Sequence, residues 1–208
     1  MPTARWPTAW IDSGGKPGWN ECRNQAEQHG KAAAPSKDYG AGSWDNEPPP
    51  VWLVELMRAK SKHQILWGGN YYKLEPSRCW LVWDKKQNDA WTTGQAEMAW
   101  TNLDRPVRVF RFAQCEQASE GPKFHPTQKP LALMAWCLKW IKAPTVLDPF
   151  MGSGSTGVAC AMHRRGFVGI ERERKYFDIA CERIARAQAQ GTLLLPEPAP
   201  DMVQEGLL

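Results

Sequence analysis

The chain has 208 residues, of which 42% are hydrophobic and 23% charged, and its formal net charge is +4. This composition is that of an ordinary globular domain with a core of its own, and the mild basicity suits a nucleic-acid partner without requiring one. Because the N-terminus carries no apolar signal region and no run of about 18 apolar residues occurs, we expect a cytoplasmic protein that is neither exported nor inserted in a membrane.

The first 50 residues are rich in glycine, proline, serine, asparagine and charged residues, and they end in the three prolines 48–50. Residues 1–28 show almost no hydrophobic periodicity, so we expect an atypical, disordered segment there. After the prolines, apolar residues recur at helical spacing over 51–59 and predict a helix.

Three short apolar runs then predict strands. Residues 64–67 precede a glycine turn, and residues 79–83 form a nearly continuous apolar run that suits a strand buried on both faces. Residues 107–112 alternate apolar and basic side chains. We expect a half-exposed strand in this last run, with Arg108 and Arg111 on one face.

The second half of the chain alternates helices with strands. The predicted elements are a helix over 131–140, a buried strand over 145–147, a helix from 158 that ends at Gly166, a strand over 167–171 and a helix over 176–187. This alternation predicts an α/β fold with a mostly parallel sheet and helices on both faces. Residues 191–208, which contain three prolines, are expected to form a flexible tail.

The six cysteines form no C-x-x-C pair, and no histidine stands at metal-ligand spacing beside them. We therefore expect reduced thiols, no disulfide framework and no zinc site. Cys137, Cys160 and Cys181 lie in predicted helices, where we expect them to be free and buried.

The strongest chemical signal lies between Val146 and Glu171. A predicted strand opens into a loop with glycines at 152, 154 and 157, and the next strand ends in the Glu171 carboxylate. Glycines let backbone amides approach a ligand closely, and an acidic side chain at that place can accept both hydroxyls of a ribose. Since no lysine follows the last glycine, a nucleoside without phosphates is favoured; a tight strand-to-helix connection is the structural alternative.

The loop closely resembles motif I of DNA adenine-N6 and cytosine-N4 methyltransferases, which binds S-adenosylmethionine (SAM): it reads Asp148-Pro149-Phe150-Met151-Gly152-Ser153-Gly154-Ser155-Thr156-Gly157. Gly169-Ile170-Glu171 resembles motif II. The segment that precedes the loop, His125-Pro126-Thr127-Gln128-Lys129-Pro130, resembles motif X. The order X, I, II is that of the β-class of these enzymes, and the resemblance spans about residues 30–187.

This resemblance implies a Rossmann-like SAM-dependent methyltransferase fold over residues 29–190, with SAM as the cofactor. Phe150 would flank the methionine part, Thr127 and Lys129 would lie near its carboxylate, and Glu171 would hold the ribose hydroxyls. The residues that the resemblance assigns to the cofactor are His125, Thr127, Lys129, Asp148, Pro149, Phe150, Gly152, Ser153, Gly154, Thr156 and Glu171.

One part of the family pattern is missing. These enzymes flip a base out of the duplex and hold its exocyclic amine with a tetrapeptide of the type D-P-P-Y, and the sequence contains neither this nor N-P-P-Y or S-P-P-W. The near-match at 46–51 lacks the aromatic residue and also reads as a proline stop before a helix. Residues 1–28 are therefore either out-of-frame sequence or part of a degenerate or split enzyme. The catalytic residues stay unassigned.

By resemblance, the partner is double-stranded DNA, the setting is restriction-modification, and a homodimer is one assembly that the sequence allows. A small target-recognition insert is expected near 101–123, where basic side chains either contact phosphates or form solvated strand faces: Arg105, Arg108, Arg111 and Lys123. The function expected is methylation of adenine N6. Cytosine N4, a non-catalytic SAM- and DNA-binding remnant, and a methyltransferase for RNA or a small molecule are the alternatives.

Overall fold

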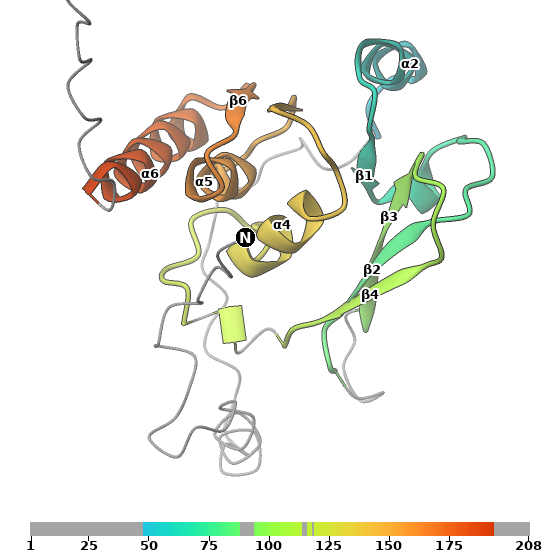
Figure 1. Ribbon diagram of the computed structural model, residues 1–208, viewed down its shortest axis with the longest axis horizontal. Helices are drawn as coiled ribbons and strands as arrows, with labels where there is room; N and C mark the ends of the chain where they lie inside the picture. The colour runs from blue at the N-terminus through green and yellow to red at the C-terminus, as the bar shows by residue number, and fades with distance from the viewer. Residues whose placement is uncertain (1–47, 88–93, 114–115, 118, 194–208) are drawn as a thin grey trace, which may run out of the picture.

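The computed structural model describes residues 48–87, 94–113, 116–117 and 119–193 (Figure 1). The disordered segment expected at 1–28 lies outside the described residues, as does most of the expected tail. The helices and strands are α2 (Val51–Lys60), β1 (Ile65–Trp67), the short 3-10 helix η3 (Gly69–Tyr71), β2 (Trp80–Asp84), β3 (Ala96–Thr101), β4 (Arg108–Arg111), α4 (Leu131–Leu138), β5 (Thr145–Asp148), α5 (Ser155–Met162), β6 (Gly166–Gly169) and α6 (Arg174–Leu193).

The described strands form two sheets. The larger one has the order β1-β3-β2-β4, in which β3 is antiparallel to β1 and β2, whereas β2 and β4 are parallel. The smaller one is the parallel pair β5-β6, joined through α5. The predicted α/β class with a Rossmann-like strand-helix-strand unit is confirmed. The pairing is more mixed than the mostly parallel sheet expected, with two parallel and two antiparallel pairs among the described strands.

A single core connects the two sheets through α4. In Figure 1 the four-stranded sheet and the β5-α5-β6 unit lie on opposite sides of this helix. Buried side chains from all three layers form one cluster, which includes Leu81 of β2, Leu133 of α4 and Cys160 of α5. Burial of apolar surface between the layers therefore fixes where the loop after β5 lies relative to the larger sheet.

Pro50 lies immediately before α2, and its carbonyl oxygen accepts a hydrogen bond from the amide of Leu53. The prolines therefore lie directly before a helix, which agrees with the interpretation of residues 46–51 as a proline stop. Residues 46 and 47 lie outside the described residues. No helix in the described part of the chain is both long enough and apolar enough to cross a membrane.

Two expectations about side-chain direction are wrong. Arg108 is half-buried and Arg111 is exposed, because residues three positions apart on a strand point to opposite faces. Cys181 is exposed, whereas Cys137 and Cys160 are buried as expected. Cys181 lies on α6, whose apolar stripe faces α5 and leaves this thiol on the outer side.

Candidate functional site

The glycine loop connects β5 to α5 in a tight turn. The amide of Met151 donates to the carbonyl oxygen of Ile170 at 3.0 Å, and the amide of Gly154 donates to the carbonyl oxygen of Met151 at 2.8 Å. Gly152 and Gly154 have φ angles of +51° and +81°, in the left-handed region that favours glycine. The turn therefore depends on glycine at both positions.

The two glycines face different neighbours. A side chain at Gly154 would place its Cβ 2.9 Å from Cβ of Ala180, so this glycine allows α6 to pack closely against the turn. A Cβ at Gly152 would lie 3.6 Å from the imidazole ring of His125, which is ordinary contact. Gly154 is thus required by packing, whereas Gly152 lies where the turn meets the segment at 125–130.

Glu171 closes the turn from the loop after β6, which ends at Gly169 and not at residue 171 as expected. Its Oε2 accepts a hydrogen bond from the amide of Gly152 at 2.9 Å, and its Oε1 accepts one from the amide of Glu173 at 2.8 Å. The side chain is half-buried. Because each carboxylate oxygen carries two lone pairs, both oxygens keep the capacity to accept a hydrogen bond from a ligand hydroxyl.

Asp148 ends β5 at the entrance to the turn. Its Oδ1 accepts a hydrogen bond from the amide of Phe150 at 3.1 Å. Burial raises the pKa of Asp148, and the nearby carboxylate of Glu171 raises it further. The ring of Phe150 is 54% exposed, so it stands open beside these two acids.

The segment 125–130 lies against the turn through His125. This histidine is buried, and its ring meets the ring of Tyr176 on α6 edge-on at 4.2 Å between centroids. The hydroxyl of Thr127 lies 3.1 Å from Nδ1 of His125, and Thr127 itself is exposed. Residues far apart in the sequence are therefore assembled around one glycine loop.

Two residues that the sequence analysis did not assign complete this assembly. Oε1 of Gln128 accepts hydrogen bonds from the hydroxyl of Ser153 at 2.8 Å and from the amide of Phe124 at 3.0 Å. Arg183 of α6 donates to the carbonyl oxygen and to the hydroxyl of Ser153. Both residues lie within the stretches that resemble the family, but a single sequence gives no signal that they contact the buried Ser153.

Lys129 lies on the other side of the site. Its Nζ is 2.7 Å from Oε2 of Glu97 on β3 and 5.3 Å from the centroid of the Trp67 ring. Lys129 is thus connected to the larger sheet. Its charge also lowers the pKa of Asp148 slightly, against the larger effect of burial, which raises that pKa.

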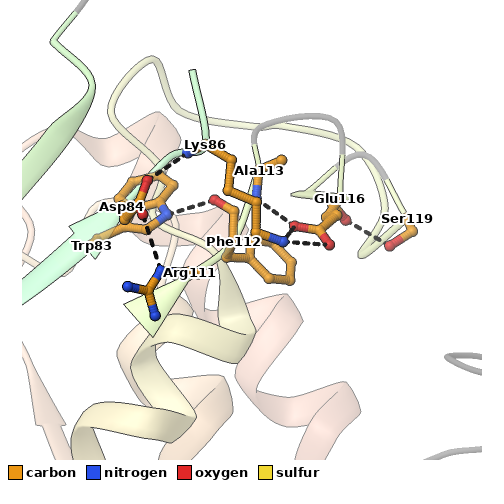
Figure 2. Close-up of polar contacts among 8 residues, drawn as sticks. All are labelled: Trp83, Asp84, Lys86, Arg111, Phe112, Ala113, Glu116 and Ser119. Carbon is orange, nitrogen blue, oxygen red and sulfur yellow. Dashed lines mark hydrogen bonds and ion pairs between the residues drawn. The ribbon is translucent and has the colours of Figure 1, made fainter. Parts of the chain in front are cut away.

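A second polar cluster lies at the carboxyl ends of β2 and β4 (Figure 2). Asp84 accepts a hydrogen bond from the amide of Lys86 at 2.8 Å and pairs with Nε of Arg111 at 3.4 Å, while Nζ of Lys86 lies 3.4 Å from Glu116. Nε1 of Trp83 donates to the carbonyl oxygen of Phe112 at 2.8 Å. Each cation in this cluster is thus matched by a carboxylate.

The basic residues expected to contact DNA do not form one patch. Arg111 pairs with Asp84 at the carboxyl end of β4. Arg105 and Arg108 lie near the other end, where their guanidinium groups stand 5.9 Å and 5.2 Å from the centroid of the Trp140 ring. The three arginines are divided in this way because they lie at opposite ends of β4.

The turn, the acid that follows β6 and the segment at 125–130 lie together at the carboxyl edge of a parallel strand pair, which is where α/β proteins bind nucleosides. Residues 21–182, well over half of the chain, match the model of the N6 and N4 methyltransferase family, described as DNA methylase. The chain belongs to this family.

Its relatives include the Type II methyltransferase M.HinfI of Haemophilus influenzae, which is 45% identical over 113 residues that make up 50% of this chain and 32% of that protein. The Type II methyltransferase M2.MboI of Moraxella bovis is 28% identical over 148 residues, or 68% of this chain and 47% of that protein. A crystal structure of an M1.HpyAVI-SAM complex matches 50% of this chain and 60% of that chain at 30% identity, with a TM-score of 0.41. The chain spans between about a third and about half of the length of the two curated relatives.

Proposed function

We propose that this chain binds SAM in the glycine turn and serves a methyltransferase that modifies the exocyclic N6 amine of adenine in DNA. The observation that carries the proposal is the hydrogen bond between the amide of Gly152 and the carboxylate of Glu171, which joins the two halves of a nucleoside site. Membership of the DNA methylase family and the similarity to M.HinfI support it.

The residues present fit a nucleoside that carries an aliphatic chain. Glu171 offers lone pairs for two ribose hydroxyls, and the exposed Phe150 supplies an apolar wall. When bound, SAM would supply an electrophilic methyl group. The chain's own residues position it, since placement and electrostatics account for most of the catalysis of such transfers.

The experiment that tests this proposal uses the full chain with tritiated SAM and unmethylated duplex DNA. Tritium that remains in the DNA after removal of free SAM supports a methyltransferase. Digestion of that DNA to nucleosides then separates N6-methyladenine, which we expect, from N4-methylcytosine, the alternative within the family. Tritium in neither nucleoside contradicts the proposed transfer.

A second candidate is a chain that binds SAM and DNA but does not transfer the methyl group. It is favoured by the sequence, whose 208 residues contain no tetrapeptide of the D-P-P-Y type. Calorimetric titration with SAM distinguishes the two, because binding without label in the DNA identifies the second candidate and absence of binding contradicts both.

The remaining expectations belong to the same proposal. We assign residues 29–190 to the methyltransferase domain and the stretch near 101–123, which contains β4, to target recognition. Double-stranded DNA is the proposed partner and the cytoplasm the proposed location. Light scattering of the sample used for titration measures whether the chain forms a homodimer.

A further inference from the structure

The carboxylate of Glu97 lies between two lysines from separate parts of the chain. Oε1 is 3.0 Å from Nζ of Lys85, which follows β2, and Oε2 is 2.7 Å from Nζ of Lys129. The side chains of Lys85 and Lys129 are only 11% and 21% exposed. One carboxylate thus holds two largely buried ammonium groups.

A third lysine belongs to this cluster. Partial burial lowers the pKa of Lys123, Glu97 raises it, and the charges of Lys85 and Lys129 lower it again. The next residue, Phe124, donates its amide to Oε1 of Gln128 at 3.0 Å, so the backbone brings the exposed Lys123 close to Lys129. The Lys85-Lys123-Lys129-Glu97 group, called the lysine cluster below, carries three positive charges and one negative charge.

The lysine cluster lies at the edge of the sheet where ligands of α/β proteins bind. β1 and β2 are both antiparallel to β3, so their carboxyl ends meet at the edge where β3 begins, and Glu97 is the second residue of β3. The same edge lies beside the glycine turn, because Lys129 follows Gln128, whose Oε1 accepts a hydrogen bond from the hydroxyl of Ser153 in the turn at 2.8 Å. Ligands in open α/β sheets bind outside these carboxyl ends.

The charge of the lysine cluster is not balanced. A half-buried group of like charges is unfavourable unless a counter-charge approaches, and among the described residues the three lysines and the one carboxylate leave a net formal charge of +2. The ring of Trp67 near Lys129 and the ring of Trp83, 5.3 Å from Nζ of Lys85, restrict the approach of water on one side of each lysine.

We propose that the lysine cluster binds backbone phosphates of the nucleic acid whose base enters the site. This inference rests on the proposed function, and it names how the DNA is held. Lysine binds phosphate as a point charge, without reading sequence, which suits a position that must accept any flanking nucleotide. Two neighbouring phosphates match the two unbalanced charges, whereas the one carboxylate of SAM would match only one.

The test is the salt dependence of binding of the full chain to a short fluorescein-labelled DNA duplex, measured by polarisation. We expect the double variant Lys85→Gln and Lys123→Gln to reduce the slope of log K against log salt by about 1.8, since each neutralised phosphate contributes about 0.9. The control is Lys142→Gln, which changes an exposed lysine at the opposite edge, before β5, and should leave the slope unchanged.

A third variant reverses the sign of the effect. Glu97→Gln removes the carboxylate that competes for the lysines, so we expect tighter DNA binding at low salt, whereas a purely structural ion pair predicts weaker binding. Thermal melting of each variant verifies that the chain remains folded. An unchanged slope in the double variant, or weaker binding by a folded Glu97→Gln chain, overturns the inference.

The outcomes separate this inference from the proposed function. If the unsubstituted chain binds SAM but not the duplex, the DNA partner fails together with the phosphate assignment. If it binds the duplex and the double variant keeps the full slope, only the phosphate assignment fails. If the double variant keeps the slope but loses affinity for SAM, the lysine cluster binds the cofactor carboxylate and the inference is wrong.

Discussion

The amide nitrogen of Gly152 lies 2.9 Å from Oε2 of Glu171, so the acid two residues beyond β6 is held against the turn that follows β5. Parallel pairing sets this relationship, because Asp148 of β5 stands opposite Gly169 of β6 and brings both loops to one edge. The carboxylate is thereby fixed in place before any ligand arrives.

We expect Glu171→Ala to weaken SAM binding by about tenfold to a hundredfold. Hydrogen bonds to a charged group contribute about 1.5–3 kcal/mol, and a factor of ten in affinity corresponds to about 1.4 kcal/mol. Isothermal titration calorimetry measures the change. Glu182→Ala is the matched control, because this exposed glutamate of α6 forms an ion pair with Arg186 and its removal should leave the affinity unchanged.

The two glycines of the turn should differ in their effect on stability. Gly154→Ala introduces a left-handed residue and a Cβ that clashes with Ala180, so we expect the free energy of unfolding to fall by about 2–4 kcal/mol. Gly152→Ala also places alanine in a left-handed conformation, but its Cβ would lie 3.6 Å from the His125 ring without a clash. We therefore expect the free energy of unfolding to fall by about 1–2 kcal/mol. Urea unfolding measures both. Equal losses would contradict the packing assigned to Gly154.

Asp148 should make stability depend on pH. Because burial raises its pKa, the folded chain keeps this proton at pH values where the unfolded chain has released it. The contribution of Asp148 to the stability of the fold is fully present below its ordinary pKa of 3.8, and it is lost as the pH rises through the raised pKa of the folded chain. Asp148→Asn should therefore stabilise the chain at neutral pH.

The stabilisation by Asp148→Asn should shrink as the pH is lowered towards 3.8. Thermal unfolding of both chains across this range measures the difference. Glu173→Gln, which changes a carboxyl group two residues beyond Glu171, serves as the comparison for a surface acid. If the unfolding temperatures of the Asp148→Asn chain and the parent chain differ by the same amount at every pH, the pKa of Asp148 is not raised.

The cysteines should differ in reactivity. Burial raises the pKa of Cys137 to about 12 and that of Cys160 to about 11, so neither is a thiolate in mildly alkaline solution. Cys181 is exposed. Titration with Ellman's reagent should show one fewer fast-reacting thiol in Cys181→Ser and an unchanged number in Cys160→Ala. The opposite result would show that α6 is packed differently.

The glycine turn could be predicted from sequence because its requirements are local. Glycines at 152 and 154 and an acid at 171 are needed by the geometry of one strand-turn-helix-strand unit, and all of them occur at fixed spacing. Even here the start of α5 is predicted three residues late. The left-handed Gly154 allows the helix to begin at once, at Ser155.

One interior strand of the larger sheet, β3, could not be predicted in this way. β3 contains Ala96, Glu97 and Ala99, which have weak intrinsic preference for strands, and it forms because β1 and β2 supply hydrogen-bonding partners on both sides. The partner of Lys129 was missed for the same reason. Glu97 is brought to this lysine by β3, and no spacing in the sequence relates the two residues.

The hydroxyl of Ser153 couples the turn to its surroundings, since Ser153 contacts both Gln128 and Arg183. A movement of the turn would break contacts to the 124–128 segment and to α6 together, so the binding-competent shape is preorganised. A ligand that enters such a site loses little affinity to the ordering of loops, and most of its contact energy is available for binding.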